Sequence, residues 1–533
     1  MKTPAEILNI PKFDQWFPGQ QDLYSQMKEW TESDGRFLGC ALPTGYGKSL
    51  LGMLTAVSGS PGDGKVVFLT STKGLQSQLM SDFGSLGMVD IRGQNDYTCI
   101  EFPRTQVDKA PCHTGYACPV KAQCHYYSQL DKARRSHMVV TNYHYWMYQT
   151  NHTPDGLDLV QRDERGQVIS RNNTTRLLIC DEAHQVNSAL ESFLSLRFTK
   201  RDHEWFPWQV DWDYDTWVHE ARLAKTDMEE ELVQLVGRIS RTEPGSDLNA
   251  KLVTKHQQMQ ALDRRLNELR KGSCVGWVPQ STEEEATWTP VKPGVYNHLL
   301  FQSVPKVLLM SAMFTKPMMQ KLNIQGEWID APSPFPVRNT PIMHINTVRV
   351  DYRATDEQML AWVKRIDEII GARQFKKGII FTVSYARARF LAHNSIYSGQ
   401  MYQHTSRNIA QVVEQFKKAK PPAVLVSPSV TTGYDFPEKE CEYIVVGKIP
   451  YPDSRGALIK ARQKEDSNHT AQLAMEVLVQ EAGRGTRSAT DRCQVFVVDD
   501  TWKWWWPKHS ELAPSWFRDR ILKSSLSHIP IQI

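Results

Sequence analysis

The sequence predicts two α/β domains, each built on a parallel β-sheet. Short runs rich in valine, isoleucine and leucine end at polar, glycine or proline residues, and helix-like stretches separate them. Strands buried on both faces have this uninterrupted apolar character. A proline-rich stretch at 332–341 divides the runs into two groups, as a linker would. The runs are Val66–Leu69, Met138–Val140, Leu177–Cys180 and Val307–Met310, then Ile379–Phe381, Val424–Val426, Ile444–Val446 and Val495–Val498.

Length and composition narrow the class of protein. At roughly 150 residues per domain, 533 residues predict three or four domains. The 63 basic and 59 acidic residues nearly cancel, so a nucleic-acid site would be a local groove. A hydrophobic share of 41% excludes disordered, collagen-like and disulfide-scaffold proteins. The chain has no apolar run of membrane-spanning length and no signal-like start, which favours the cytoplasm and no membrane partner.

Between residues 190 and 287 the apolar spacing becomes helical. One set recurs at helical spacing before the turn-forming Pro244–Asp247, and a second set recurs at near-heptad spacing after it. We expect an antiparallel helical hairpin inserted in the first α/β domain, because the repeat is too short for a coiled-coil dimer. The two sets are Met228, Leu232, Leu235, Val236 and Ile239, then Leu252, Met259, Leu262, Leu266 and Leu269.

A candidate phosphate loop, Pro43–Ser49, follows an apolar stretch and opens onto a helix-like one. Gly45 and Gly47 would let backbone N–H groups approach phosphate oxygens. Lys48 would reach the outer phosphates, and the Ser49 hydroxyl would bind Mg²⁺. Leu42 stands where the strict pattern has glycine, so a glycine-rich turn without a ligand is the alternative.

A carboxylate pair, Asp181 and Glu182, follows directly after the predicted strand Leu177–Cys180. A strand ending in two carboxylates can place one on Mg²⁺ and the other beside an attacking water. Asp181 would hold the metal, and Glu182 would act as the general base. An ordinary surface pair is the alternative, and the phosphate loop upstream weakens it.

The segment Gln480–Arg487 lies in the second predicted domain and carries Arg484 and Arg487. Arginines three residues apart on a helix share one face, so we expect both to point the same way. Their planar, permanently charged groups suit phosphate, and a second domain can supply them as arginine fingers. A surface salt bridge is the alternative for either arginine alone.

These residues, in this order, resemble the superfamily 2 helicases, and the details resemble the XPD/DinG family of iron–sulfur helicases. The Asp181–His184 tetrapeptide reads as a DEAH box, and Gln480–Arg487 matches Gln-x-x-Gly-Arg-x-x-Arg in full. Ser311-Ala312-Met313 stands in place of the family's Ser-Ala-Thr, so the third hydroxyl is missing. Further similar segments are Phe17–Gln20, Thr70–Gln78 (motif Ia), Thr141–Tyr145, Phe381–Tyr385 (motif IV) and Thr432–Pro437 (motif V).

The resemblance implies two RecA-like P-loop motor domains with ATP in the cleft between them. It also implies an iron–sulfur domain and a helical Arch-like domain, both inserted in the first motor domain. The expected divisions are motor domain 1 at 1–98, 136–190 and 288–330, the iron–sulfur domain at 99–135, the Arch-like domain at 191–287 and motor domain 2 at 331–533.

The resemblance also assigns site residues. The expected catalytic residues are Lys48, Asp181, Glu182, Gln480, Arg484 and Arg487. The expected ATP and Mg²⁺ ligands are Gln20, Thr44, Gly45, Gly47, Lys48, Ser49, Asp181, Gly433 and Asp435. Residues expected to bind DNA or to couple it to ATP are His184, Thr70, Thr72, Gln76, Tyr143 and Ser311.

Four cysteines, Cys99, Cys112, Cys118 and Cys124, lie within 26 residues. In a cytoplasmic protein such a group suggests a metal rather than disulfides. Structural zinc sites usually show tighter cysteine pairs, so these wide gaps favour a 4Fe–4S cluster. Their place between motif Ia and the DEAH box is the family's place for its cluster. Zinc, with His113 or His125 as a further ligand, and free thiols are the alternatives.

Together these features predict an ATP-dependent DNA helicase, a monomeric motor that moves 5′ to 3′ on single-stranded DNA by family resemblance. Its partners would be single-stranded DNA and forked or flapped duplexes, in the cytoplasm or, for a phage protein, the host cytoplasm. A translocase that remodels nucleoprotein without unwinding and an ATP-switched binding module are the alternatives. Further candidate strand-binding residues are Trp16, Tyr145, Lys73, Lys132, Arg134 and Arg135. Three adjacent tryptophans, Trp504–Trp506, cannot all face one way.

Overall fold

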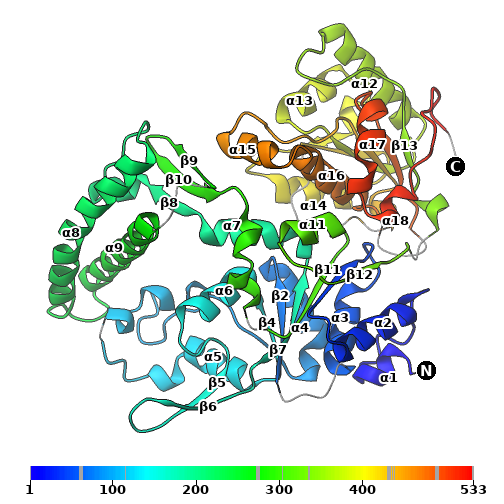
Figure 1. Cartoon of the computed structure of the whole chain (residues 1–533). Helices are drawn as coiled ribbons and strands as arrows, with labels where there is room; N and C mark the ends of the chain where they lie inside the picture. Colours follow the sequence, from blue (N-terminus) through cyan, green and yellow to red (C-terminus); the bar gives the residue numbers. More distant parts are fainter. Residues whose placement is uncertain are drawn as a thin grey trace.

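The first sheet has seven parallel strands in the order β12-β1-β11-β7-β2-β4-β3 (Figure 1). The computed structural model describes residues 2–58, 64–114, 116–271, 276–302, 304–333, 336–428, 434, 436, 438–486 and 491–530. The strands are β1 (Phe37–Ala41), β2 (Lys65–Thr70), β3 (Met88–Asp90), β4 (Met138–Asn142), β7 (Thr175–Asp181), β11 (Lys306–Ser311) and β12 (Glu327–Asp330).

Alternate residues of these strands pack against opposite layers of helices. In β2, Val66 and Phe68 join the core beneath α2 (Gln20–Glu32) and α3 (Lys48–Ser58). Val67 and Leu69 join the opposite core, beneath α6 (Tyr143–His152) and α7 (Val186–Leu194). Because both faces are covered, the strands need apolar residues at every position, as their sequences have.

The second sheet has six parallel strands in the order β13-β18-β17-β14-β16-β15. The strands are β13 (Ile342–His344), β14 (Lys377–Phe381), β15 (Met401–Gln403), β16 (Ala423–Ser427), β17 (Tyr443–Val446) and β18 (Gln494–Val497). Its helices include α12 (Asp356–Gly371), α13 (Tyr385–Asn394), α14 (Ile409–Lys418), α16 (His469–Ala482) and α17 (Trp502–His509). Every predicted run lies in or overlaps an observed strand, and the proline-rich stretch separates the sheets, so the predicted α/β architecture is confirmed.

The predicted helical hairpin is also present, as α8 (Tyr214–Ile239) and α9 (Asp247–Lys271). Leu235 and Met228 of α8 are buried in one core with Leu262 and Met259 of α9, whereas Val236 is exposed. The hairpin stands on a small antiparallel sheet in the order β8-β10-β9, which the sequence analysis did not anticipate. These strands are β8 (Leu196–Thr199), β9 (Trp277–Ser281) and β10 (Glu285–Pro290).

The cysteine segment consists of short turns and α5 (His125–Arg135), and the buried Lys65 fastens it to β2. The Lys65 ammonium donates to the carbonyls of Ala133 (2.7 Å) and Arg134 (3.1 Å) in the last turn of α5. It also donates to the carbonyl of Leu157 at 2.5 Å. Carbonyls at a helix C-terminus attract cations, so this one side chain ties the last turn of α5 and the Leu157 carbonyl to β2.

The far end of the hairpin contacts the cysteine segment (Figure 1). Gln257 of α9 donates a hydrogen bond to the carbonyl of Asp108. The Phe102 ring lies so close to the Gly245 backbone that an added Cβ would be 1.9 Å from it. The hairpin is therefore held at its root by motor domain 1 and at its tip by the cysteine segment. No helix in the described ranges combines the length and the apolarity that a bilayer span needs.

Candidate active site

The candidate phosphate loop lies between the carboxyl end of β1 and the start of α3. Gly45 and Gly47 have φ of 77° and 78°, a region that favours glycine. Gln20, 1% exposed, lies behind the loop and donates to the Tyr46 carbonyl at 2.9 Å. The side-chain oxygen Oε1 of Gln20 accepts from the Phe17 N–H at 3.1 Å, and the Tyr46 hydroxyl donates to the Pro18 backbone carbonyl at 3.1 Å. The segment before α2 therefore braces the loop.

The carboxylate pair lies at the carboxyl end of β7. Asp181 is buried, and its backbone carbonyl accepts a hydrogen bond of 2.7 Å from the Tyr143 hydroxyl. Glu182 adopts a left-handed conformation with φ 51° and ψ 48°, which is uncommon outside glycine. Such conformations persist where the surrounding structure enforces them, and they concentrate at functional sites.

The two carboxylates differ in their electrostatic environment. Burial raises the pKa of Asp181 to about 6, and the charge of Glu182 adds to the rise. Burial also tends to raise the pKa of Glu182, but Lys48, His184 and Ser311 together outweigh it and hold that pKa below its usual range. Glu182 therefore stays ionised near neutral pH, as a residue that accepts a proton or orients a water must.

A chain of hydrogen bonds, which we call the relay, joins Glu182 to the second α/β domain. The Ser311 hydroxyl donates to Glu182 Oε2 at 3.1 Å, so it must accept from His184 Nδ1 at 2.7 Å. His184 Nδ1 therefore carries the proton, and Nε2 accepts from the Gln480 amide at 3.1 Å. A neutral histidine satisfies every bond of the relay, which has Glu182 at one end and Gln480 of α16 at the other.

Arg484 does not lie on the predicted helix. Helix α16 ends at Ala482 and is capped by Gly483, so Arg484 lies in the following turn. Arg484 donates to the Tyr434 carbonyl at 2.9 Å. A Cβ added at Gly483 would lie 3.5 Å from Thr44 Oγ1, so this turn lies against the phosphate loop. Three predicted site residues, Arg487, Gly433 and Asp435, lie outside the described residues.

A groove of about 800 Å³ lies between motor domain 1 and the cysteine segment. Thr70 and Tyr143 line its floor but are buried, and Gln76 is buried beside it with its amide on the Ile91 carbonyl at 3.0 Å. The Thr72 hydroxyl accepts from the Leu75 N–H at 3.2 Å and so caps α4 (Lys73–Phe83). Most of these residues, which were predicted to bind the DNA strand, are therefore buried beneath the groove surface and do not project into the groove.

A row of exposed rings beside the groove escaped the sequence analysis. His144, Tyr148 and His152 recur every four residues along α6 and therefore share one face. The Phe193 ring of α7 stacks on His152 at 5.8 Å and lies 6.4 Å from His144. Tyr148 is 47% exposed. The i, i+4 spacing of aromatic residues was the signal that could have found this aromatic row.

Other predicted strand-binding aromatics have structural roles. Trp16 stacks on Tyr24 at 5.4 Å, and the hydroxyls of Tyr145 and Tyr126 are hydrogen-bonded at 3.2 Å inside the core. In α17, Trp505 is buried and Trp504 is 45% exposed, which confirms that the three adjacent tryptophans do not share one face.

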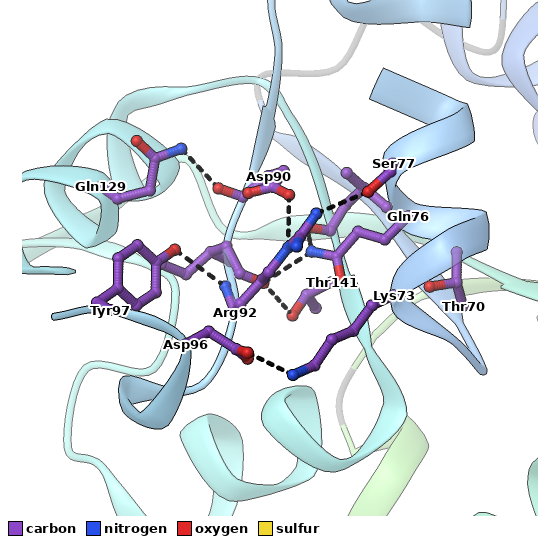
Figure 2. A network of polar contacts seen from close by, with 12 residues as sticks. Thr70, Lys73, Gln76, Ser77, Asp90, Arg92, Asp96, Tyr97, Gln129 and Thr141 are labelled. Carbon is purple, nitrogen blue, oxygen red and sulfur yellow. Dashed lines mark hydrogen bonds and ion pairs between the residues drawn. The ribbon is translucent and has the colours of Figure 1, made fainter. Parts of the chain in front are cut away.

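Polar contacts join the motif Ia helix to the segment leading to Cys99 (Figure 2). The Arg92 guanidinium binds Asp90 at 3.0 Å and Ser77 of α4 at 2.9 Å. The Arg92 N–H donates to the Tyr97 hydroxyl at 3.3 Å, and Lys73 pairs with Asp96. The cysteine segment is therefore anchored to the same helix that forms one side of the groove.

The four clustered cysteines are free thiols near one another. Burial raises the pKa of the Cys112 thiol, and Cys118, Cys99 and Cys124 all add to that rise, so the four thiols face a common region. His113 Nε2 is hydrogen-bonded to the Val107 carbonyl at 2.8 Å. In the described part of the chain, no set of three or more His, Cys, Asp or Glu side chains is arranged to hold a metal ion.

The fold and the site define a two-domain P-loop motor, with the phosphate loop and carboxylates on one domain and Gln480 on the other. Two family models each match one part of the chain. The "Helicase C-terminal domain" model matches residues 369–520, and the "Type III restriction enzyme, res subunit" model matches residues 14–201. No curated protein matches the sequence significantly.

Solved XPD structures share the fold over nearly their whole length. An XPD helicase has a TM-score of 0.61 at 14% identity, covering 93% of this chain and 98% of that one. XPD in an apo structure (TM-score 0.57, 13% identity) and Xpd4 of S. tokodaii (0.57, 14%) each cover 95% of this chain and 99% of their own. The chain therefore has the fold of the XPD helicases, and its second α/β domain matches the helicase C-terminal domain model.

We expect Gly47→Ala to weaken ATP binding by about tenfold or more, because alanine resists a φ of 78° and its Cβ would lie 2.7 Å from Gln20 Nε2. Fluorescent-nucleotide titration measures the affinity. Gly74→Ala is the matched control, since its nearest new contact is Thr72 Oγ1 at 3.8 Å. Unchanged affinity in Gly47→Ala would contradict the assignment of Pro43–Ser49 as the phosphate loop.

Proposed function

We propose that this chain is an ATP-dependent DNA helicase of the DEAH type that translocates on single-stranded DNA and separates duplex strands. The observation that carries the proposal is the relay, because it connects the general base of one domain to the other domain. The family resemblance favours 5′ to 3′ movement, with forked or flapped duplexes as substrates and the monomer as the working unit.

ATP and Mg²⁺ would bind between the phosphate loop and the carboxylate pair. Lys48 would hold the outer phosphates, and Ser49 and Asp181 would hold Mg²⁺. The donor set fits a cation: Asp181 is buried, and its raised pKa reflects a charge that needs a counter-ion there. Bound ATP supplies the phosphoanhydride whose cleavage drives the cycle. By motif alone, Arg487, Gly433 and Asp435 would complete the site from motor domain 2.

The relay explains how hydrolysis would be linked to movement. Gln480 moves with motor domain 2, so opening of the cleft withdraws its amide from His184. Ser311 then holds Glu182 less firmly, because its hydroxyl donates to the carboxylate and is itself hydrogen-bonded to His184. The base would therefore be aligned only while the domains are closed, which makes hydrolysis depend on domain position.

The groove and its aromatic row are the proposed path of the strand on motor domain 1. Bases of any sequence stack on rings, so a motor that must pass over every sequence can use them. Tyr148 offers an exposed ring beside the groove, and the partly buried Phe193 ring is among the residues that line it. The near-neutral net charge of +4 suits a motor that releases its strand in every cycle.

We further propose that Cys99, Cys112, Cys118 and Cys124 hold a 4Fe–4S cluster. A single zinc ion gathers its donors around one point, whereas a four-iron cluster spreads its thiolates over separate irons. Cys118, Cys99 and Cys124 all act on the pKa of the Cys112 thiol, which supports a common site for the four cysteines. The bound cluster would cross-link the turns of this segment.

Glu182→Gln should lower ATP turnover about 100-fold or more while ATP still binds, because the amide cannot accept the proton. Steady-state turnover, measured with and without single-stranded DNA, tests this. Glu164→Gln, an exposed change between β5 (Leu159–Arg162) and β6 (Val168–Asn172), should leave turnover unaltered. If ATP turnover changes neither with single-stranded DNA nor in Glu182→Gln, the helicase proposal is refuted.

Phe193→Ala should weaken binding of single-stranded DNA about tenfold, the loss of one stacked base. Anisotropy with a labelled oligonucleotide measures the affinity. Phe375→Ala removes a ring that is 88% exposed at the amino-terminal edge of the second sheet, away from the groove, and serves as the matched control. Equal effects of the two changes would refute the proposed path.

Anaerobically purified protein should contain about four iron atoms per chain. Cys118→Ser should lose iron and the visible absorption of the cluster, because a hydroxyl is a poor ligand for it. His113→Ala should keep the iron, since His113 is engaged by the Val107 carbonyl. One zinc per chain with no iron, or loss of the metal in His113→Ala, would overturn the cluster proposal.

A further inference from the structure

An arginine of motor domain 2 contacts both chain segments that connect the Arch-like insert to motor domain 1. Arg462 lies on α15 (Ala457–Glu465), and its side chain is 12% exposed. It donates to the carbonyls of Pro290 at 2.9 Å and Val291 at 3.1 Å, where the chain leaves the insert. It also pairs with Glu191 at 3.0 Å, on the helix by which the chain enters the insert. We call this group the clasp.

The clasp is the strongest of several contacts between α15 and the root of the insert. Lys292 pairs with Glu465, but both side chains are about half exposed, so the pair contributes little. Gly456, just before α15, lies beside β9, since an added Cβ would be 3.6 Å from Gln280 Nε2. Arg462 differs because its guanidinium is mostly buried and binds three oxygens in a fixed geometry.

Motor domain 2 therefore holds the helix α7 segment at two points. The first is the Gln480–His184 contact of the relay, two residues before α7 begins. The second is the Arg462–Glu191 pair near the other end of the helix. A short α-helix behaves as a rigid rod, so a displacement at one point is carried to the other.

The other end of the insert is held more weakly than its root. The contact of Phe102 with Gly245 at the hairpin tip, and the hydrogen bond from Gln257 in the middle of α9 to the Asp108 carbonyl, join the hairpin to the cysteine segment. In the described residues no ion pair joins the hairpin tip to the cysteine segment. A movement imposed at the root would therefore show itself at this tip.

We propose that Arg462 is a positioning residue that transmits movement of motor domain 2 to the Arch-like insert. The change in domain position between nucleotide states pulls on β10 and α7 through the clasp and shifts the hairpin against the cysteine segment. The proposal rests on the proposed function only in taking ATP as the ligand that moves the domains. The relay responds to the bound nucleotide, and the clasp transmits the resulting domain movement to the insert.

The test compares the full chain with Arg462→Gln and Arg462→Lys, using a fluorophore pair at Val233 on α8 and Ile169 on β6, both strongly exposed. Energy transfer in the unaltered chain should differ between a non-hydrolysable ATP analogue and ADP. Arg462→Gln should remove at least half of that difference and lower strand separation about tenfold, with DNA-stimulated ATP turnover within about twofold. Arg462→Lys should be intermediate, since it keeps the charge but cannot reach all three oxygens.

Arg455→Gln is the matched control, because Arg455 precedes α15, is 89% exposed and pairs only with Asp453 among the described residues. If Arg462→Gln is too unstable to purify, Glu191→Gln, which removes one of the three contacts, replaces it. A full nucleotide-dependent difference in either variant, or none in the unaltered chain, overturns the proposal. The fluorescence measurement needs only nucleotide binding, so a chain that binds ATP without separating strands refutes the proposed function and still tests the clasp.

Discussion

The hydrogen-bonded relay from Gln480 through His184 and Ser311 to Glu182 is the interaction on which the arrangement of the site depends. It exists because β11 pairs with β7 in register, with Met310 opposite Asp181, so that Ser311 ends beside Glu182. His184 bridges the remaining distance, with Nδ1 on the Ser311 hydroxyl and Nε2 on the Gln480 amide. Because Gln480 belongs to the second α/β domain, the geometry of the carboxylate pair depends on the position of that domain relative to the first.

Much of the fold could be predicted from the sequence, and the exceptions have one physical reason. Strands such as β2 and β17 are buried at every position, so their runs of Val, Ile and Leu stand out. The strands β6 and β9 are exposed or partly buried and contain polar residues such as glutamine, serine and asparagine. They therefore have no apolar run from which a strand could be predicted. The hairpin helices were predictable because one face of each packs on the other, which gives a periodic pattern.

The candidate site was predictable in its residue types but less so in its orientations. Spacing identified Lys48, the carboxylate pair and the four cysteines, because their chemistry needs those types in that order. It could not reveal that Gln76 and Tyr143 turn inward, since either face of a helix start can hold them. It also placed Arg484 on a helix that ends at Ala482, because the two glycines on either side of Arg484 halt α16 against the phosphate loop.

Helix α7 shows why these parts act as one machine. Its buried face, Val186 and Leu190, fixes it to motor domain 1, and Phe193 turns toward the groove. Glu191 contacts Arg462 of motor domain 2 instead, and the helix begins two residues after the relay histidine. Phe193 follows Leu190 by three residues and lies on the same side of the helix, at its end, whereas Glu191 lies on a different face. Nine residues thus contact the core, the groove and the other motor domain, so a displacement at one of these contacts is carried by the helix to the other two.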